Sequence, residues 1–108
     1  YVEAAILKLE AEGKPYFVDF TAKWCGICQW NKNTAIRKQD TYKAFIEKGV
    51  TLFEADMTNE NPDLSKAIKK YGRKAVPVYV IYDGKSKWRV LPSTLTQGLL
   101  IDEINSIP

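Results

Sequence analysis

The 108-residue sequence contains no histidine and only two cysteines, Cys25 and Cys28. Two candidate ligands are too few for a structural zinc site or for an iron–sulfur cluster held within one chain, each of which needs about four. A c-type haem motif would need histidine after the second cysteine, where Gln29 stands. The same absence excludes histidine-based acid–base catalysis and Cys–His nucleophilic catalysis. We therefore expect no metal ion and no haem.

Long apolar runs and an excess of one charge are also missing. The longest apolar run, residues 76–82, is far too short to cross a bilayer, so we expect no direct membrane insertion by this chain. The 16 lysines and arginines outnumber the 13 aspartates and glutamates only slightly, and they are scattered. We therefore expect no nucleic-acid partner. No signal peptide is recognisable, and the abrupt start at Tyr1 in helix-like sequence favours an excised domain of a longer protein.

The remaining composition is ordinary for a globular protein, with 45% hydrophobic and 27% charged residues. A chain of this length suits one domain, residues 1–108, which can bury roughly 65% of its unfolded surface. No repeat, linker or low-complexity segment divides it. We expect a single domain that functions as a monomer.

Apolar residues recur at helical spacing in several segments. We expect a helix before Gly13, another that starts near the cysteines, a third from an Asp40 N-cap to Gly49, a fourth from residue 62 or 63 to Gly72, and a terminal helix after Pro92. The residues expected to face inward are Val2, Ala5, Ile6 and Leu9; Tyr42, Phe45 and Ile46; Leu64, Ala67, Ile68 and Tyr71; and Leu100, Ile104 and Ile107.

Four short segments are expected to form strands: residues 16–20, 50–56, 77–82 and 88–91. The first is aromatic and apolar on both faces, which is typical of a central buried strand. The last two flank the turn at Asp83-Gly84 and should form a hairpin. The resulting order, α-β-α-β-α-β-β-α, predicts an α/β fold with a central mixed β-sheet flanked by helices on both faces.

Cys25 and Cys28 lie between the expected central strand and the helix that follows it. Two cysteines at this spacing can form a short disulfide, which constrains little of the unfolded chain and is a poor structural staple. At a helix N-terminus, free N–H groups and the helix dipole favour the thiolate of Cys25, while Cys28 points back into the helix. Redox exchange is the predicted role, and two ordinary core cysteines are the structural alternative.

Asp19, the motif Trp24-Cys25-Gly26-Ile27-Cys28 and the pair Val76-Pro77 together resemble the thioredoxin superfamily, and the resemblance extends over essentially the whole chain. Residues 13–19 and 55–59 are most similar to the C-terminal thioredoxin-like domain of DsbD, the bacterial thiol:disulfide interchange protein. Secreted thioredoxin-like proteins are close competitors. The resemblance implies the thioredoxin fold and a redox-active Cys25–Cys28 disulfide without any other cofactor.

The resemblance also implies roles for individual residues. Cys25 matches the nucleophile of the family, and Cys28 matches its resolving cysteine. Pro77 matches a cis-proline that faces the disulfide, and Val76 matches a residue whose backbone binds a partner strand. An ordinary trans proline that opens a strand is the alternative for Pro77. The other expected partner-binding residues are Trp24, Gly26 and Ile27.

Asp19 matches the buried acid beneath the two cysteines of the family. A carboxylate in an apolar strand is costly unless it is neutral or paired, and a raised pKa would suit Asp19 to proton exchange with Cys28. An edge-exposed or salt-bridged aspartate is the alternative. Trp24 fits either a packing lid over the active-site loop or a partner contact, whereas Trp30 and Trp88 are expected to be packing residues.

Two positions depart from the family pattern. DsbD C-terminal domains tend to carry glutamate four residues after the second cysteine, where this chain has Lys32, and a cation there would favour a thiolate. Glu54 stands where many thioredoxins place lysine near the buried aspartate. A coupled acidic pair would result if Asp19 and Glu54 both pointed inward, but we expect Glu54 to be solvated.

These observations predict a protein-disulfide reductase that passes reducing equivalents from the Cys25–Cys28 dithiol to partner proteins. Histidine, which strongly oxidising relatives generally carry between the cysteines, is absent. The alternatives are a secreted oxidase or isomerase of the same fold and a non-catalytic partner-binding module. The resemblance implies partners with disulfides or dithiols, with other domains of the parent chain as candidates. It also implies a periplasmic or other extracytoplasmic location, with the cytoplasm as the alternative.

Overall fold

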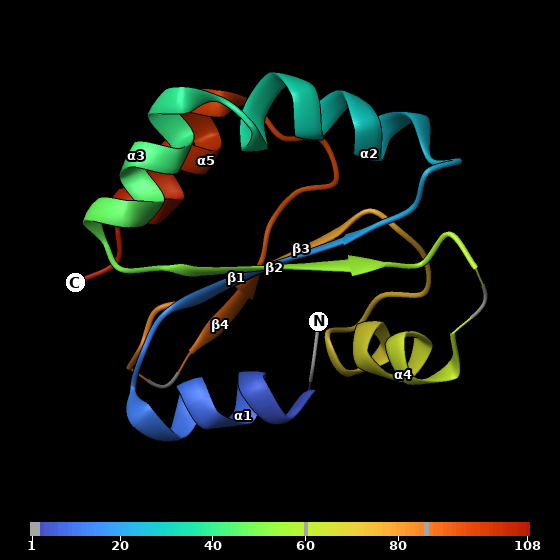
Figure 1. The fold of residues 1–108 in the computed structure, drawn as a ribbon, viewed down its shortest axis with the longest axis horizontal. Helices are drawn as coiled ribbons and strands as arrows, with labels where there is room; N and C mark the ends of the chain where they lie inside the picture. The colour runs from blue at the N-terminus through green and yellow to red at the C-terminus, as the bar shows by residue number, and fades with distance from the viewer. Residues whose placement is uncertain (1–2, 60, 86) are drawn as a thin grey trace.

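Figure 1 shows the computed structural model of the protein, which describes residues 3–59, 61–85 and 87–108. The strands are β1 (Tyr16–Thr21), β2 (Thr51–Asp56), β3 (Val78–Tyr82) and β4 (Trp88–Val90). The helices are α1 (Glu3–Glu12), α2 (Gly26–Asn31), the π-helical turn η1 (Lys32–Ile36), α3 (Gln39–Glu47), α4 (Pro62–Lys70) and α5 (Gln97–Asn105). The order of strands and helices agrees with the prediction, except that the segment between β1 and β2 contains three helical elements.

The four strands form one mixed sheet in the order β2-β1-β3-β4. β1 pairs parallel with β2 and antiparallel with β3, and β3 and β4 form the predicted hairpin. Every residue of β1 is buried, which confirms the prediction of a central strand. Because Asp19 is in register with Glu54 on β2 and with Tyr79 on β3, its neighbours across the sheet are fixed by this pairing.

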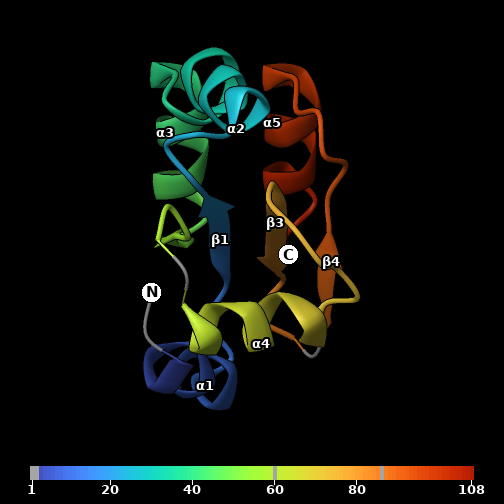
Figure 2. The same ribbon diagram turned by 90° about the vertical axis from the view of Figure 1, so that its right-hand side faces the viewer.

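Helices cover both faces of the sheet, as predicted (Figures 1 and 2). α1 and α4 lie on one face, and α2, η1, α3 and α5 lie on the other. Side chains alternate along β1, so Val18 and Phe20 join the apolar cluster under α1 and α4, whereas Phe17 joins the cluster under α3 and α5. Asp19 and Thr21 share the second face with Phe17 because they are two and four residues further along the strand.

The start of α4 and its buried face agree with the sequence prediction. Asn61 caps the helix by accepting hydrogen bonds from the N–H groups of Asp63 and Leu64. Pro62 occupies the first turn, where its missing backbone N–H group would have no acceptor within the helix. The four predicted inward residues of this helix, Leu64, Ala67, Ile68 and Tyr71, are all buried. In α1 the predicted residue Ile6 is fully buried, and Val2, assigned to the same stripe, lies outside the described residues.

The predicted inward face of α3 was wrong in two of its three positions. Phe45 is buried, but the side chains of Tyr42 and Ile46 are 41% and 78% exposed. The helix starts earlier than predicted, with Lys38 rather than Asp40 as the N-cap, and it turns Thr41 and Ala44 inward. These small residues face the turn before α3, where the Thr41 hydroxyl donates a 2.6 Å hydrogen bond to the Ala35 carbonyl.

No helix within residues 3–59, 61–85 and 87–108 has the length and apolar character needed to span a membrane.

Candidate active site

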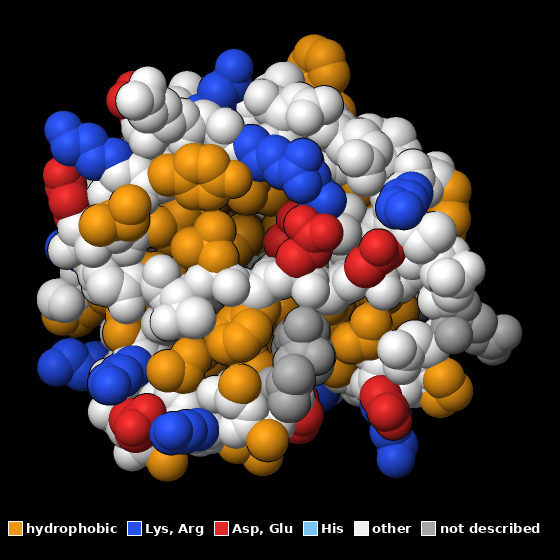
Figure 3. All heavy atoms as spheres, in the orientation of Figure 1, with side chains coloured by type: hydrophobic (Ala, Val, Ile, Leu, Met, Phe, Trp, Pro, Cys, Tyr) orange, Lys and Arg blue, Asp and Glu red, His pale blue; other side chains and the backbone are white. Residues whose placement is uncertain are grey.

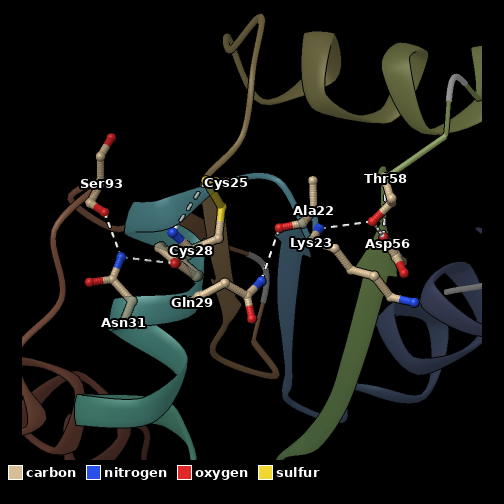
Figure 4. The surroundings of a disulfide bond; sticks show 10 residues. Ala22, Lys23, Cys25, Cys28, Gln29, Asn31, Asp56, Thr58 and Ser93 are labelled. Carbon is tan, nitrogen blue, oxygen red and sulfur yellow. Dashed lines mark hydrogen bonds between the residues drawn. A yellow bond between two sulfur atoms is a disulfide. The ribbon is translucent and has the colours of Figure 1, made fainter.

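The two cysteines lie at the junction of β1 and α2, where the chain leaves the sheet and enters the helix (Figure 4). They form a disulfide with a Cα–Cα distance of 5.2 Å. Cys25 is the N-cap residue of α2, and its Sγ atom accepts a 3.2 Å hydrogen bond from the Cys28 N–H group. One of the free N–H groups of the first helical turn, that of Cys28, therefore points at the sulfur of Cys25, as expected for a residue at the helix N-terminus.

The two cysteines differ in burial, in the direction expected for a Cys28 side chain that points back into the helix. Cys28 is 1% exposed and Cys25 is 9% exposed. Ala22 and the partly buried Val76 pack with the two cysteines. The remaining exposure belongs to Cys25, which makes it the more accessible sulfur for an incoming partner.

Apolar side chains surround Cys25 on the surface of the molecule. The Trp24 ring is 66% exposed, and its Nε1 atom donates a 3.1 Å hydrogen bond to the Thr58 carbonyl. This exposure favours the partner contact over the packing lid for Trp24. Ile27 is 44% exposed, and a Cβ atom at Gly26 would meet no described heavy atom within 4 Å. The residues predicted to contact a partner thus form an open apolar rim around the disulfide.

The Val76–Pro77 peptide bond is cis, the conformation that the family resemblance implied. Val76 packs against the cluster that contains Cys25 and Cys28, so the segment before β3 lies directly beside the disulfide. The structure brings this segment together with the α2 N-terminus although about fifty residues separate them in sequence.

Two polar residues that the sequence analysis did not single out anchor α2. Asn31 is fully buried, and its side chain donates hydrogen bonds of 2.9 Å to the Tyr79 hydroxyl and 2.8 Å to the Ser93 carbonyl. Its oxygen accepts a 3.1 Å bond from the Leu95 N–H group. Gln29 donates a 2.9 Å bond to the Ala22 carbonyl (Figure 4). The available signal was spacing, since Asn31 lies three residues after the buried Cys28 and therefore on the same helix face.

Asp19 lies in the sheet below this helix and is only 4% exposed, so the edge-exposed alternative is excluded. Its Oδ1 atom has no hydrogen-bond partner among the described residues. Burial raises the pKa of the Asp19 carboxyl to about 6; Lys32 and Arg37 act in the opposite direction, and Glu54 adds to the rise. A carboxyl group with this pKa changes protonation state close to neutral pH.

Lys32 and Glu54, the two departures from the family pattern, form an ion pair. The Lys32 Nζ atom lies 3.3 Å from Glu54 Oε2, and their side chains are 7% and 50% exposed respectively. Glu54 is exposed, as expected from the sequence, and it is also paired with Lys32. The burial of Lys32 was not expected.

The remaining tryptophans differ from each other. Trp30 is 63% exposed, so its prediction as a packing residue was wrong; it lies three residues after Ile27, on the outer side of α2. Trp88 is 40% exposed but packs edge-on against Tyr71, with 4.8 Å between ring centroids. Nowhere in the described part of the chain do three or more cysteine, aspartate or glutamate side chains gather as they would to hold a metal ion.

Comparisons with known proteins agree with this geometry. The chain is 28% identical to the chloroplastic thioredoxin Y2 of Arabidopsis thaliana over 98 residues, which cover 91% of the chain and 54% of that protein. It is 26% identical to the thiol:disulfide interchange protein DsbD of Campylobacter jejuni over 90 residues, which cover 77% of the chain and 14% of that protein. The chain thus spans about half of one of these curated relatives and a small part of the other.

Solved structures have the same fold. The oxidised C-terminal domain of DsbD from Neisseria meningitidis superimposes with a TM-score of 0.76 at 20% sequence identity, over 100% of this chain and 98% of that one. A family model described as thioredoxin-like matches residues 1–84, which contain β1, the disulfide, the cis-proline and most of the sheet. The chain belongs to the thioredoxin-like family.

Proposed function

We propose that this chain is a single thioredoxin-like domain that reduces disulfides in partner proteins with the Cys25–Cys28 dithiol. The observation that carries the proposal is the disulfide at the start of α2, where the sulfur of Cys25 accepts a hydrogen bond from a helix N–H group. When the disulfide is reduced, the same N–H group and the helix dipole favour the thiolate of Cys25. Thiolate is the form that attacks disulfides.

The reaction proceeds in two exchange steps. In the first, the Cys25 thiolate bonds to one sulfur of the partner disulfide, and the other partner sulfur leaves as a thiolate. In the second, the Cys28 sulfur bonds to Cys25, and the bond between Cys25 and the partner breaks. The partner gains two electrons and ends as a dithiol, and the Cys25–Cys28 pair loses two electrons and ends as the disulfide. No third cysteine exists in the chain to replace Cys28 in the second step.

Asp19 supports the second step as a proton acceptor. Cys28 is almost completely buried, so its thiol has little direct contact with water from which to lose a proton. Asp19 lies in the adjacent strand, three residues before Ala22, which packs on both cysteines. Its pKa of about 6 allows the carboxylate to be present at neutral pH and still to accept a proton at modest cost.

The partner binds across the rim around Cys25. Trp24 and Ile27 offer exposed apolar surface, and Val76 packs against the cluster that holds the two cysteines. Gly26, next to Cys25, carries no side chain that could obstruct a partner, and a Cβ atom there would meet no described heavy atom within 4 Å. This arrangement suits an extended segment that carries a disulfide, with its backbone against Val76.

The similarity to DsbD supports an extracytoplasmic location and a parent protein whose other domains exchange electrons with this one. A soluble thioredoxin is the alternative, and the similarity to thioredoxin Y2 favours it. The full reading frame separates the two: a signal peptide and upstream membrane spans are expected for a DsbD-type parent, and a short cytosolic frame would contradict it.

Reduction of insulin disulfides tests the activity. We expect the wild-type protein to accelerate reduction by dithiothreitol and the Cys25→Ser variant to lose this acceleration.

The reduction potential, measured by equilibration with glutathione buffers, then shows whether the protein acts as a reductant or as an oxidant. We expect a reduction potential of about −270 mV, the value of thioredoxin. A potential of about −120 mV would identify an oxidant. Absence of any acceleration by wild-type protein would leave a non-catalytic binding module.

A further inference from the structure

The positive net charge of the protein comes from one segment of the chain. Residues 64–82, which run from α4 to the end of β3, contain five lysines and arginines and no aspartate or glutamate. Outside this segment acidic side chains outnumber basic ones, because the whole sequence has 16 lysines and arginines and 13 aspartates and glutamates. On the face of the molecule that Figure 3 shows, acidic and basic side chains are interspersed.

Two of the cations in this segment, Arg73 and Lys74, lie in the connection that leads from α4 to the redox site. Gly72, with a φ of 77°, turns the chain away from the end of α4. Arg73 and Lys74 follow and are both exposed. The connection then reaches Val76, which packs against the two cysteines, and continues into β3 (Figure 2). Arg73 and Lys74 are called the basic loop below.

The basic loop is close enough to the disulfide to act on a bound partner. Each residue of a chain spans at most about 3.6 Å, so the backbone of Lys74 lies within about 7 Å of Val76 and that of Arg73 within about 11 Å. The Debye length at physiological ionic strength is about 8 Å. The two positive charges are therefore only partly screened from a partner segment that lies against Val76.

The two cations of the basic loop are not paired with any acidic side chain in the described part of the chain. Cations elsewhere in the fold do have such partners. Lys32 and Arg37 lie 3.3 Å and 3.9 Å from the same oxygen of Glu54. The basic loop can therefore form ion pairs with carboxylates of another molecule without first breaking pairs of its own.

The rest of the surface around Cys25 contributes little net charge. The apolar rim is uncharged, and the exposed Lys23 beside it is offset by Asp56. Hydrogen bonds from Thr58 lower the pKa of the Asp56 carboxyl, and the charge of Lys23 lowers it further. Asp19 is 4% exposed and cannot reach a partner. The site thus combines an uncharged apolar rim with the basic loop.

We propose that the basic loop selects partner proteins whose disulfide is flanked by aspartate or glutamate residues. This inference rests on the proposed function and names the class of segment on which it acts. Because the two cations stand beside a site of disulfide exchange, the anionic groups that match them are carboxylates of the protein that carries the disulfide. The exchange of bonds and electrons at Cys25 and Cys28 is the same for every partner.

The attraction between the basic loop and the carboxylates forms before Cys25 attacks, and it persists in the transition state. An interaction of equal strength in both states lowers KM and leaves kcat unchanged. The preference for an acidic partner should therefore be a difference in KM. It should also weaken with salt, because the Debye length falls to about 3 Å at 1 M ionic strength.

The test compares two peptides with the same intramolecular disulfide ring. The acidic peptide carries two aspartates on each side of the ring, and the basic peptide carries two lysines at the same places. Initial rates of reduction are measured with dithiothreitol as the recycling reductant and are corrected for the uncatalysed reaction. At low salt we expect kcat/KM to be roughly 3- to 30-fold higher for the acidic peptide, mainly through KM, and the ratio to fall toward 1 at high salt.

Substitutions in the basic loop should change this ratio. We expect the double variant Arg73→Glu/Lys74→Glu to prefer the basic peptide. The neutral variant Arg73→Gln/Lys74→Gln should lose most of the preference, and it keeps the test decisive if the charge-reversed protein does not fold. Each protein acts on the same two peptides, so differences in the reactivity of the peptides themselves cancel between variants.

The matched control is the double variant Lys8→Glu/Lys43→Glu. It changes the net charge as much as Arg73→Glu/Lys74→Glu does, at exposed positions of α1 and α3. Neither helix adjoins the start of α2 (Figure 1). We expect the control to keep the wild-type ratio to within about twofold, because exposed charges beyond a Debye length are largely screened.

The possible results separate this inference from the proposed function. Loss or reversal of the preference in the loop variants, with the ratio of the control retained, supports the inference. Equal kcat/KM for both peptides, or the same change in the control as in the loop variants, overturns it, while reduction of both peptides leaves the proposed function standing.

If wild-type protein reduces neither peptide, the proposed function fails. Versions of both peptides with serine in place of cysteine are then titrated into the protein, and binding is followed by the ¹⁵N amide shifts of residues 73–76. Tighter binding of the acidic version supports the selection by charge, and equal binding of the two versions overturns it.

Discussion

The two faces of the sheet bury different chemistry. Under α1 and α4, the buried cluster consists of aliphatic and aromatic side chains, with the Tyr16 and Tyr82 rings stacked at 5.1 Å between centroids. The opposite face holds all the buried non-aromatic polar side chains among the described residues: Asp19, Thr21, Asn31, Lys32 and Thr41. One strand, β1, supplies both faces, because its side chains alternate.

The difference indicates that the two faces of the sheet have different roles. Burial of apolar area stabilises a fold, whereas burial of a carboxyl group without a partner costs free energy. The polar residues lie on the face that α2 covers, and Lys32 follows Cys28 by one helical turn, with its N–H group donating to the Cys28 carbonyl. Both faces bury an apolar cluster that stabilises the fold, and the opposite face also carries the cost of the buried polar side chains.

The largest effect on stability is expected from the apolar face. Ile68 of α4 is 1% exposed, and Ile68→Ala should lower the free energy of unfolding by about 2–5 kcal/mol because it leaves a cavity in a packed cluster. The rate of insulin reduction by the folded protein should not change. Urea denaturation and the insulin assay measure the two quantities. The matched control, Lys69→Ala on the exposed side of α4, should change stability by at most about 0.5 kcal/mol. A large loss of activity in folded Ile68→Ala protein would contradict the division between faces.

A smaller effect of opposite sign is expected at Asp19. Burial raises its pKa from the ordinary 3.8 to about 6, so the folded state holds the proton more tightly and loses stability as pH rises from about 4 to 6. Asp19→Asn should therefore stabilise the protein by up to about 3 kcal/mol above pH 6 and by much less at pH 4.

Denaturation at pH 4 and pH 8, with and without the substitution, measures this difference. Reduction of a partner near neutral pH should slow in the same variant. An equal change in stability at both pH values would show that Asp19 is not a buried carboxyl with a raised pKa.

Asn31 lies on the same face of the sheet as Asp19 but, unlike Asp19, its side chain has hydrogen-bond partners. Asn31→Ala would leave the Tyr79 hydroxyl and the Leu95 N–H group without their bonds. We expect a loss of about 1–3 kcal/mol in the free energy of unfolding, measured by urea denaturation. No loss of stability would mean that water replaces Asn31 at no cost, and that the anchoring of α2 rests on other contacts.

The smallest effect is expected at the surface. The Arg89–Glu103 pair is partly exposed, and exposed ion pairs contribute little. Glu103→Gln should change the free energy of unfolding by less than about 1 kcal/mol, and the change should shrink further in high salt. A loss as large as that of Ile68→Ala would show that the β4 edge of the sheet depends on electrostatics.

The sequence predicted the features that depend on local pattern. The CxxC motif between an apolar strand and a helix, the stripe of α4 and the burial of β1 follow from spacing and turn chemistry. The face of α3 did not follow, because a shift in the helix start turns different residues inward, and a short helix with few apolar residues does not fix that start. Trp30 was misassigned because its size favours the core, whereas its position on α2 places it outside.

The spacing from Cys28 could place Asn31 on the buried side of α2, but sequence patterns did not reveal the hydrogen-bond partners of Asn31 or the burial of Lys32. Lysine is usually exposed, and its burial here depends on Glu54, a residue of a separate strand that meets η1 only after folding. Asn31 likewise bonds to groups 48 to 64 residues away in the sequence. Such long-range polar contacts leave no periodic signal. The ion pair on the functional face was therefore visible only in the structure.

Trapping of the mixed disulfide tests the central claim most directly, namely that Cys25 attacks and Cys28 resolves. Each single variant, Cys25→Ser and Cys28→Ser, is mixed with an oxidised protein substrate, and the products are identified by mass spectrometry. We expect a covalent complex through Cys25 in the Cys28→Ser variant, released by added dithiol, and little complex in the Cys25→Ser variant. Equal trapping by both variants, or trapping mainly through Cys28, would contradict the assignment of nucleophile and resolving thiol.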